Sequence, residues 1–148
     1  MAYTTVNKST DYFNTLLYTG NNTDGRAITG VGFQPDWVWI KGRNAALDHE
    51  VFDPVRGATK YIATNATNAE ATNSNRLQSF DTDGFTLGDS TSVNKNYNYI
   101  TWNWRAGNSS GSSNSDGSIT STVSANTTSG FSIVKYTGTG ANATVGHG

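Results

Sequence analysis

The chain has 148 residues, with 10 Lys and Arg residues, 11 Asp and Glu residues and a net charge of −1. This length suits one domain with a short addition. The positive residues are scattered singly, which excludes the basic stripe typical of nucleic-acid-binding proteins. Cysteine is absent, so disulfide bonds and thiolate metal sites are excluded. Thr, Asn, Ser and Gly make up nearly half of the chain, a composition that favours strands and tight turns over helices.

Residues 1–10 form a polar N-terminal arm without the apolar core of a secretory signal. No apolar run is long enough for a membrane-spanning helix. We therefore expect a protein that is made in a cytoplasm, is not exported by the general route and does not insert into a membrane.

Short apolar runs recur about every 8–12 residues, separated by Gly, Asn, Asp or Pro, which is the spacing of strands in a sandwich or barrel. The predicted strands are residues 12–18, 27–29, 36–41, 50–52, 60–62, 76–80, 85–87 and 97–104. Tandem Ala-Thr-Asn triplets indicate a loop within residues 65–75. The pattern predicts an all-β fold, with an antiparallel β-sandwich at residues 11–106.

The composition changes after Ala106. Residues 107–118 offer almost no apolar side chain to bury, which predicts a flexible Ser/Gly/Asn linker. Beyond it, residues 131–138 match residues 13–20 at the same spacing, with identity at Phe and at Tyr-Thr-Gly. Residues 143–148 match residues 27–32 after a two-residue gap, with identity at Ala and at two Gly positions. We therefore predict that residues 119–148 are the opening strands of a second repeat.

Two strands carry aromatic residues at alternate positions. Because side chains alternate between the faces of a strand, Trp37 and Trp39 share one face, and Val38 and Ile40 share the other. The strands predicted at residues 36–41 and 97–104 are apolar on both faces, and they are therefore predicted to be central strands of a sheet. One face is expected to pack in the core. The residues predicted to pack in the core are Phe13, Val38, Ile40, Phe80, Phe85, Ile100, Trp102 and Trp104.

The second face of these strands has three possible uses: a further packed layer, a protein interface or an aromatic platform. Exposed aromatic rings stack on sugar rings, and neighbouring Asn and Asp side chains can bind hydroxyl groups. The residues that would make such a glycan contact are Trp37, Trp39, Tyr97 and Tyr99. The alternative is that the tryptophans only fill the core, where each would bury a large apolar area.

The acidic clusters are predicted to be structural. Asp81-Thr-Asp-Gly84, with Asp89 nearby, is a candidate calcium-binding loop, but it lacks the bidentate Glu of an EF-hand. A hairpin turn with Gly84 at positive φ explains the same residues. Asp48-His49-Glu50 is predicted to be a surface loop ahead of a strand, because no second His lies near it. We expect no metal and no cofactor.

No catalytic motif is present. The chain lacks a Gly-x-Ser-x-Gly elbow and a phosphate-binding glycine loop followed by Lys. The carboxylates Asp36, Glu50, Asp53 and Glu70 are candidates for a glycosidase pair, but nothing in the sequence selects two of them. Arg56 is open to pairing with Asp53, Asp36 or a neighbouring subunit, and a solvated charge near a strand end is the default expectation. We predict no catalytic residues and no enzymatic activity.

Several motifs occur together in a fixed order. They are Tyr-Thr-Gly-Asn, Gly-Val-Gly-Phe-Gln-Pro-Asp-Trp-Val-Trp-Ile-Lys, Phe-Asp-Pro-Val-Arg-Gly-Ala-Thr-Lys-Tyr, Asp-Gly-Phe-Thr-Leu-Gly and Trp-Asn-Trp-Arg-Ala-Gly. Across residues 9–148 the chain resembles a repeat domain of unknown function found in marine and cyanobacterial phage proteins of the tail-fibre-like, virion structural kind. The resemblance implies a location in the virion and a β-sandwich of the jelly-roll or concanavalin-like type. It implies no catalytic residues.

The expected function is therefore that of a non-enzymatic virion structural protein of the tail-fibre or surface-fibre kind, made in the host bacterial cytoplasm. Its role would be architectural, adhesive to the host, or both. The expected partners are other virion subunits, further copies of the chain in a homo-oligomer, and a host-surface glycan. The alternative is a lectin-like carbohydrate-binding module.

Overall fold

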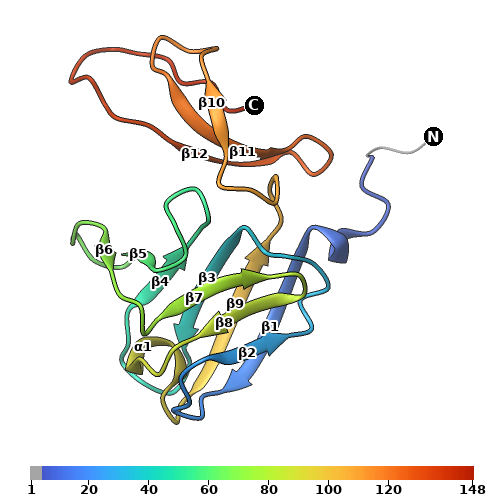
Figure 1. The fold of residues 1–148 in the computed structure, drawn as a ribbon, viewed down its shortest axis with the longest axis vertical. Coiled ribbons are helices and arrows are strands. Elements are labelled where there is room, and N and C mark those ends of the chain that lie inside the picture. Colours follow the sequence, from blue (N-terminus) through green and yellow to red (C-terminus); the bar gives the residue numbers. More distant parts are fainter. Residues whose placement is uncertain (1–4) are drawn as a thin grey trace.

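The computed structural model describes residues 5–148, and in them the chain is almost entirely β-structure (Figure 1). The strands are β1 (Phe13–Thr19), β2 (Arg26–Thr29), β3 (Trp37–Gly42), β4 (His49–Phe52), β5 (Lys60–Ala63), β6 (Ala71–Thr72), β7 (Leu77–Asp81), β8 (Gly84–Leu87), β9 (Asn98–Trp104), β10 (Ser112–Asn114), β11 (Ser121–Asn126) and β12 (Phe131–Lys135). A 3-10 helix (Ser9–Asp11) precedes β1, and a one-turn helix, α1 (Thr91–Asn94), precedes β9.

Within these described residues the strands form three antiparallel sheets. The largest has the order β1-β9-β3-β4-β5-β6, the second has the order β2-β8-β7, and the third, here called the small sheet, has the order β10-β11-β12. The first two sheets pack face to face, and the small sheet lies at one end of them (Figure 1). The predicted all-β sandwich is therefore confirmed.

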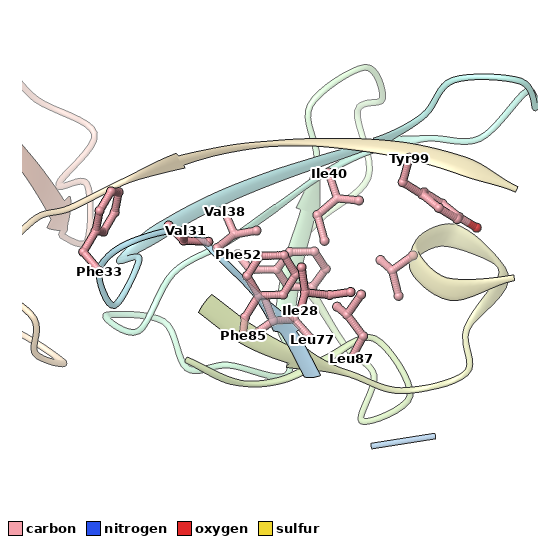
Figure 2. Close-up of a cluster of buried hydrophobic side chains, with 11 residues drawn as sticks. Ile28, Val31, Phe33, Val38, Ile40, Phe52, Leu77, Phe85, Leu87 and Tyr99 are labelled. Atoms are coloured by element: carbon pink, nitrogen blue, oxygen red, sulfur yellow. The ribbon is translucent and has the colours of Figure 1, made fainter. Parts of the chain in front are cut away.

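The hydrophobic core fills the space between the two larger sheets, and side chains from both sheets point into it (Figure 2). Val38, Ile40 and Phe85 are fully buried there, and Phe80 is partly buried against the same cluster. These are four of the residues predicted to pack in the core. The apolar residues of β3 and β8 therefore join the two layers.

All eight predicted strands form, and their ends lie within one residue of the prediction. The sequence pattern missed β6, β10, β11 and α1. These four are short or contain few apolar residues, so they carry little of the periodicity that identifies a strand or helix. β6 has only two residues and lies inside the stretch predicted as a loop.

The core prediction is wrong for one group of residues, which lie on the opposite face of the six-stranded sheet: Phe13, Ile100, Trp102 and Trp104. The burial of β9 alternates, and the buried residues are Tyr99, Thr101 and Asn103. Two polar side chains thus face the core. They are tolerated because the Asn103 amide donates to Thr101 Oγ1 at 3.0 Å and to the carbonyl of Asn14 at 3.1 Å.

The predicted hairpin at Asp81–Gly84 is confirmed: β7 and β8 pair there in antiparallel register. Gly84 has a φ of 150°, and a Cβ atom at this position would lie 1.9 Å from the carbonyl oxygen of Ile28 in β2. Glycine is therefore required by the close approach of β2 and β8 as well as by the turn.

The segment predicted as a flexible linker is tied to the rest of the protein. Asp36 Oδ2 accepts the backbone N–H groups of Ala106 at 2.7 Å and of Asn108 at 2.9 Å. The N–H of Gly107 donates to Ser124 Oγ at 3.0 Å, and residues 112–114 form β10. Polar side chains and backbone bonds supply this order, since the segment lacks apolar residues.

The strand β12 begins at Phe131, the residue that the internal repeat matches to Phe13 of β1. Both segments are strands with the same starting residue. Their pairing differs, because β1 pairs with β9 whereas β12 pairs with β11. The second repeat remains a prediction.

Candidate functional site

The face of the six-stranded sheet that points away from the core, here called the outer face, carries ordered rows of side chains. Residues paired across strands share a face, so the register defines each row. The first row is Phe13, Trp104 and Trp37. The second row is Thr15, Trp102, Trp39, Val51 and Ile62. All four tryptophans of the chain therefore lie on this one face.

Neighbouring rings on the outer face are in contact. The ring centroids of Trp39 and Trp102 are 5.3 Å apart, and those of Phe13 and Trp104 are 4.7 Å apart. The ring planes are tilted by 47° and 51°, as expected of packed aromatic pairs. His49 extends the second group, with its ring 6.4 Å from that of Trp39.

The small sheet covers one end of the outer face. Phe131 meets the Trp37 ring edge-on at 6.5 Å and stacks on the Trp104 ring at 6.2 Å. Beside it, Ile133 is buried in a second apolar cluster with Val55 and Ala106. This end of the outer face is therefore an interface between the sandwich and β12.

The four residues predicted to contact a glycan do not form one open row. Tyr99 is fully buried and lies in the core, which corrects its assignment to a surface platform. Its ring stacks on Tyr18 at 5.1 Å, and burial raises its pKa to about 12. Tyr97 is exposed and lies before β9 begins, whereas Trp37 and Trp39 are half-buried on the outer face. Trp37 and Trp39 thus share a face with each other but not with Tyr99.

A cleft of about 380 Å³ lies between the outer face and β12. Its walls include Trp37, Val51 and Ile62 from the sandwich, Tyr136 just after β12, and the charged residues Arg56 and Lys135. Sequence reasoning missed this site because its two walls are far apart in the chain. Only the position of Trp37 on a strand face pointed towards it.

Arg56 in this cleft is mostly buried and pairs with Asp53, one of the partners that the sequence left open, so it is not the solvated charge expected by default. Its Nε atom donates to Asp53 Oδ2 at 2.5 Å and its Nη2 atom donates to the carbonyl of Val51 at 2.9 Å. Its buried Nη1 atom makes no hydrogen bond with the described residues, and Glu70 Oε2 lies 3.6 Å away. The Asp53 carboxylate is also bound by the backbone N–H of Arg56 at 2.9 Å.

Two further carboxylates are buried away from the cleft. Arg76 donates to Glu50 inside the sandwich, and the Arg76 guanidinium lies 3.5 Å from the ring centre of Tyr61. Burial raises the pKa of Glu50, and Arg76 opposes that shift. Burial also raises the pKa of Asp36 at the join to the small sheet, where the N–H groups of Asn108 and Ala106 oppose it. These carboxylates hold parts of the fold together.

In the Asp48-His49-Glu50 cluster, Asp48 is an exposed residue ahead of the strand as predicted, and β4 begins at His49, one residue earlier than predicted. The alternation of the strand sends the side chains of His49 and Glu50 to opposite faces, and Glu50 is buried. The two groups therefore do not converge on a ligand.

The aspartates around the β7–β8 hairpin are engaged by protein donors. Asp83 accepts the N–H groups of Gly30 and Gly32 at 3.0 and 2.6 Å. Asp81 accepts the hydroxyls of Ser79 and Thr86, each at 2.8 Å. Within residues 5–148, no group of three or more His, Asp or Glu side chains is arranged to hold a metal ion.

Throughout the described part of the chain, no helix has the length and apolar character needed to cross a membrane.

The fold and the outer face define the chain as an all-β sandwich protein whose aromatic sheet face is partly covered by its own small sheet. The chain belongs to the family described as "Domain of unknown function (DUF7483)", whose profile matches residues 8–148. The match includes the sandwich, the small sheet and residues 105–111, which connect the two. No curated protein and no solved structure matches the chain.

Proposed function

We propose that this chain is a non-enzymatic structural module of a bacteriophage particle, of the tail-fibre or surface-fibre kind, with an architectural or host-adhesive role. The single observation that carries the proposal is the packing of Phe131 on Trp37 and Trp104. Aromatic side chains of the outer face are used here to hold a second piece of chain against the sandwich.

The resemblance of residues 9–148 to phage fibre repeats and the internal repeat of residues 13–20 at residues 131–138 support the same proposal. In a tandem array, each unit would add another sandwich, and several weak contacts on one particle would give strong attachment through a high effective concentration. The partners would be other virion subunits and further copies of this chain in a homo-oligomer.

The proposal is tested on particles of a phage that encodes this sequence. Gradient-purified particles are digested and their peptides identified by mass spectrometry, and an antibody against the chain is used for immunogold labelling. We expect the chain at a fixed copy number, with gold on the tail or surface fibres. A chain that is abundant in the lysate but missing from purified particles would overturn the proposal.

A further inference from the structure

The cleft between the outer face and β12 has the size of a small-ligand site. Its volume of about 380 Å³ lies within the range of about 300–1,000 Å³ that is usual for such sites. In Figure 1 the loop that follows β4 rises towards β12, and this loop carries Arg56. The cleft therefore has the strands of the sandwich on one side and the small sheet on the other.

The apolar part of the cleft suits a sugar ring. Trp37 supplies an indole ring, and Tyr136 supplies a phenol ring that is 56% exposed. Aromatic faces carry negative partial charge and attract the positively polarised C–H groups of a pyranose ring. Val51 and Ile62 add aliphatic surface, and Thr64 and Ser132 add hydroxyl groups that can bind sugar hydroxyls.

The charged part of the cleft suits a carboxylate. Asp53 is occupied by the backbone N–H and the Nε atom of Arg56, and the buried Nη1 atom of Arg56 lies 3.6 Å from Glu70 Oε2. Lys135 Nζ donates to the carbonyl of Val55 at 3.0 Å and has further donors to offer. Glu70 pairs with Arg56 at 3.6 Å and with Lys60 at 3.1 Å, so Asp53 and Glu70 together balance these two cations. Lys135 pairs with no carboxylate in the described residues, and it therefore supplies the surplus positive charge of the cleft.

We propose that this cleft binds a uronic-acid residue of an acidic polysaccharide. The sugar ring lies against Trp37 and Tyr136, and its carboxylate accepts hydrogen bonds from the exposed ammonium group of Lys135. This proposal is tested by ligand binding to the isolated chain, whereas the proposed function is tested by detecting the chain in phage particles. Either test can therefore fail while the other succeeds.

The test uses the full chain and three tetrasaccharides, built of galacturonate, glucuronate or guluronate, in calorimetric titrations. The methyl ester of each is the neutral control, since it keeps the ring and removes the charge. We expect at least one acid to bind and its ester to bind at least tenfold more weakly. Binding of none of the three acids, or equal binding of acid and ester, would overturn the proposal.

Variants then locate the site. Tyr136→Ala and Lys135→Met change exposed side chains at the cleft, so both chains should fold, as checked by near-ultraviolet circular dichroism. Each should weaken binding of the acid at least tenfold. Tyr97→Ala removes an exposed tyrosine outside the cleft and should leave binding unchanged. If the acid binds equally to all three variants and the parent chain, the site is elsewhere and the proposal fails.

Discussion

Phe131 of the small sheet stacks on Trp104 of the sandwich, with ring centroids 6.2 Å apart and ring planes 23° apart. Trp104 also contacts Phe13 on its own sheet, so it is packed between two phenylalanines. These are the two residues that the internal repeat matches to each other. The contact makes the outer face of the six-stranded sheet an interface, and the following predictions test its parts.

Phe131→Ala should loosen the small sheet without unfolding the sandwich. We expect a loss of about 2–3 kcal/mol in the stability of this contact, below the cost of removing a fully buried phenylalanine because Phe131 is only partly buried. Hydrogen exchange followed by mass spectrometry should show faster exchange in β11 and β12 and unchanged exchange in β3. Tyr136→Ala, which removes an exposed ring next to the same strand, is the control. Equal exchange in both variants would argue against the interface.

Trp102→Ala should cost less than Phe85→Ala. Trp102 is half-buried on the outer face, whereas Phe85 is fully buried between the sheets. We expect about 1–3 kcal/mol for Trp102 and about 3–5 kcal/mol for Phe85, measured by urea denaturation. The reverse order would mean that the two faces of β9 have been assigned wrongly.

Gly84→Ala should destabilise the sandwich by about 2–3 kcal/mol or more, because the new Cβ would collide with the carbonyl of Ile28 and φ would be strained. Gly138→Ala is the matched control, since a Cβ there meets no atom within 4 Å. Thermal unfolding of both variants checks this prediction. If the Gly84→Ala and Gly138→Ala chains have the same melting temperature, the close packing of β2 on β8 is contradicted.

Asp36 should make stability depend on pH. Because burial raises its pKa in the folded state above that in the unfolded state, the folded state binds more protons. The stabilising contribution is fully present below the ordinary carboxyl pKa and is lost as the pH rises through the raised pKa. The stability of the parent chain minus that of Asp36→Asn should therefore fall as the pH rises from about 3 to 7. Urea denaturation across this range checks the sign, and a difference that grows with pH would contradict it.

Chelation should leave the protein unchanged. Asp81 and Asp83 are bound by hydroxyl and backbone N–H donors, so no cation is needed to stabilise the hairpin. We expect the same melting temperature with and without EDTA. A clear decrease with EDTA, reversed by calcium, would restore the metal interpretation of these aspartates.

Much of the fold could be predicted because alternation and turn residues are local properties of the sequence. Apolar residues on both sides predict that β3 and β9 are central strands, and β3 indeed lies between β9 and β4 while β9 lies between β1 and β3. The same property concealed which face was the core. In β9 the core face carries Thr101 and Asn103, whose hydrogen bonds depend on the fold, while the bulkier tryptophans lie outside.

Neither the cleft nor the contact of Asp36 with residues 106–108 could be predicted, because both depend on residues that are far apart in the sequence. The sequence does not show that Asp36 binds the N–H groups of Ala106 and Asn108, because only the fold brings these groups together. Likewise, Arg56 and Lys135 are separated by 78 intervening residues in the chain and meet only because β12 packs over the sheet. Such contacts have no periodicity for a sequence to show.

The most direct test of the aromatic interface is a nuclear Overhauser measurement on the full chain with selectively labelled Phe and Trp. We expect cross-peaks from the Phe131 ring protons to the indole protons of both Trp37 and Trp104. If the cross-strand peaks between β11 and β12 are present but the peaks from Phe131 to Trp37 and Trp104 are both missing, the small sheet folds but does not pack on the sandwich. That result would contradict the interface on which the proposed function depends.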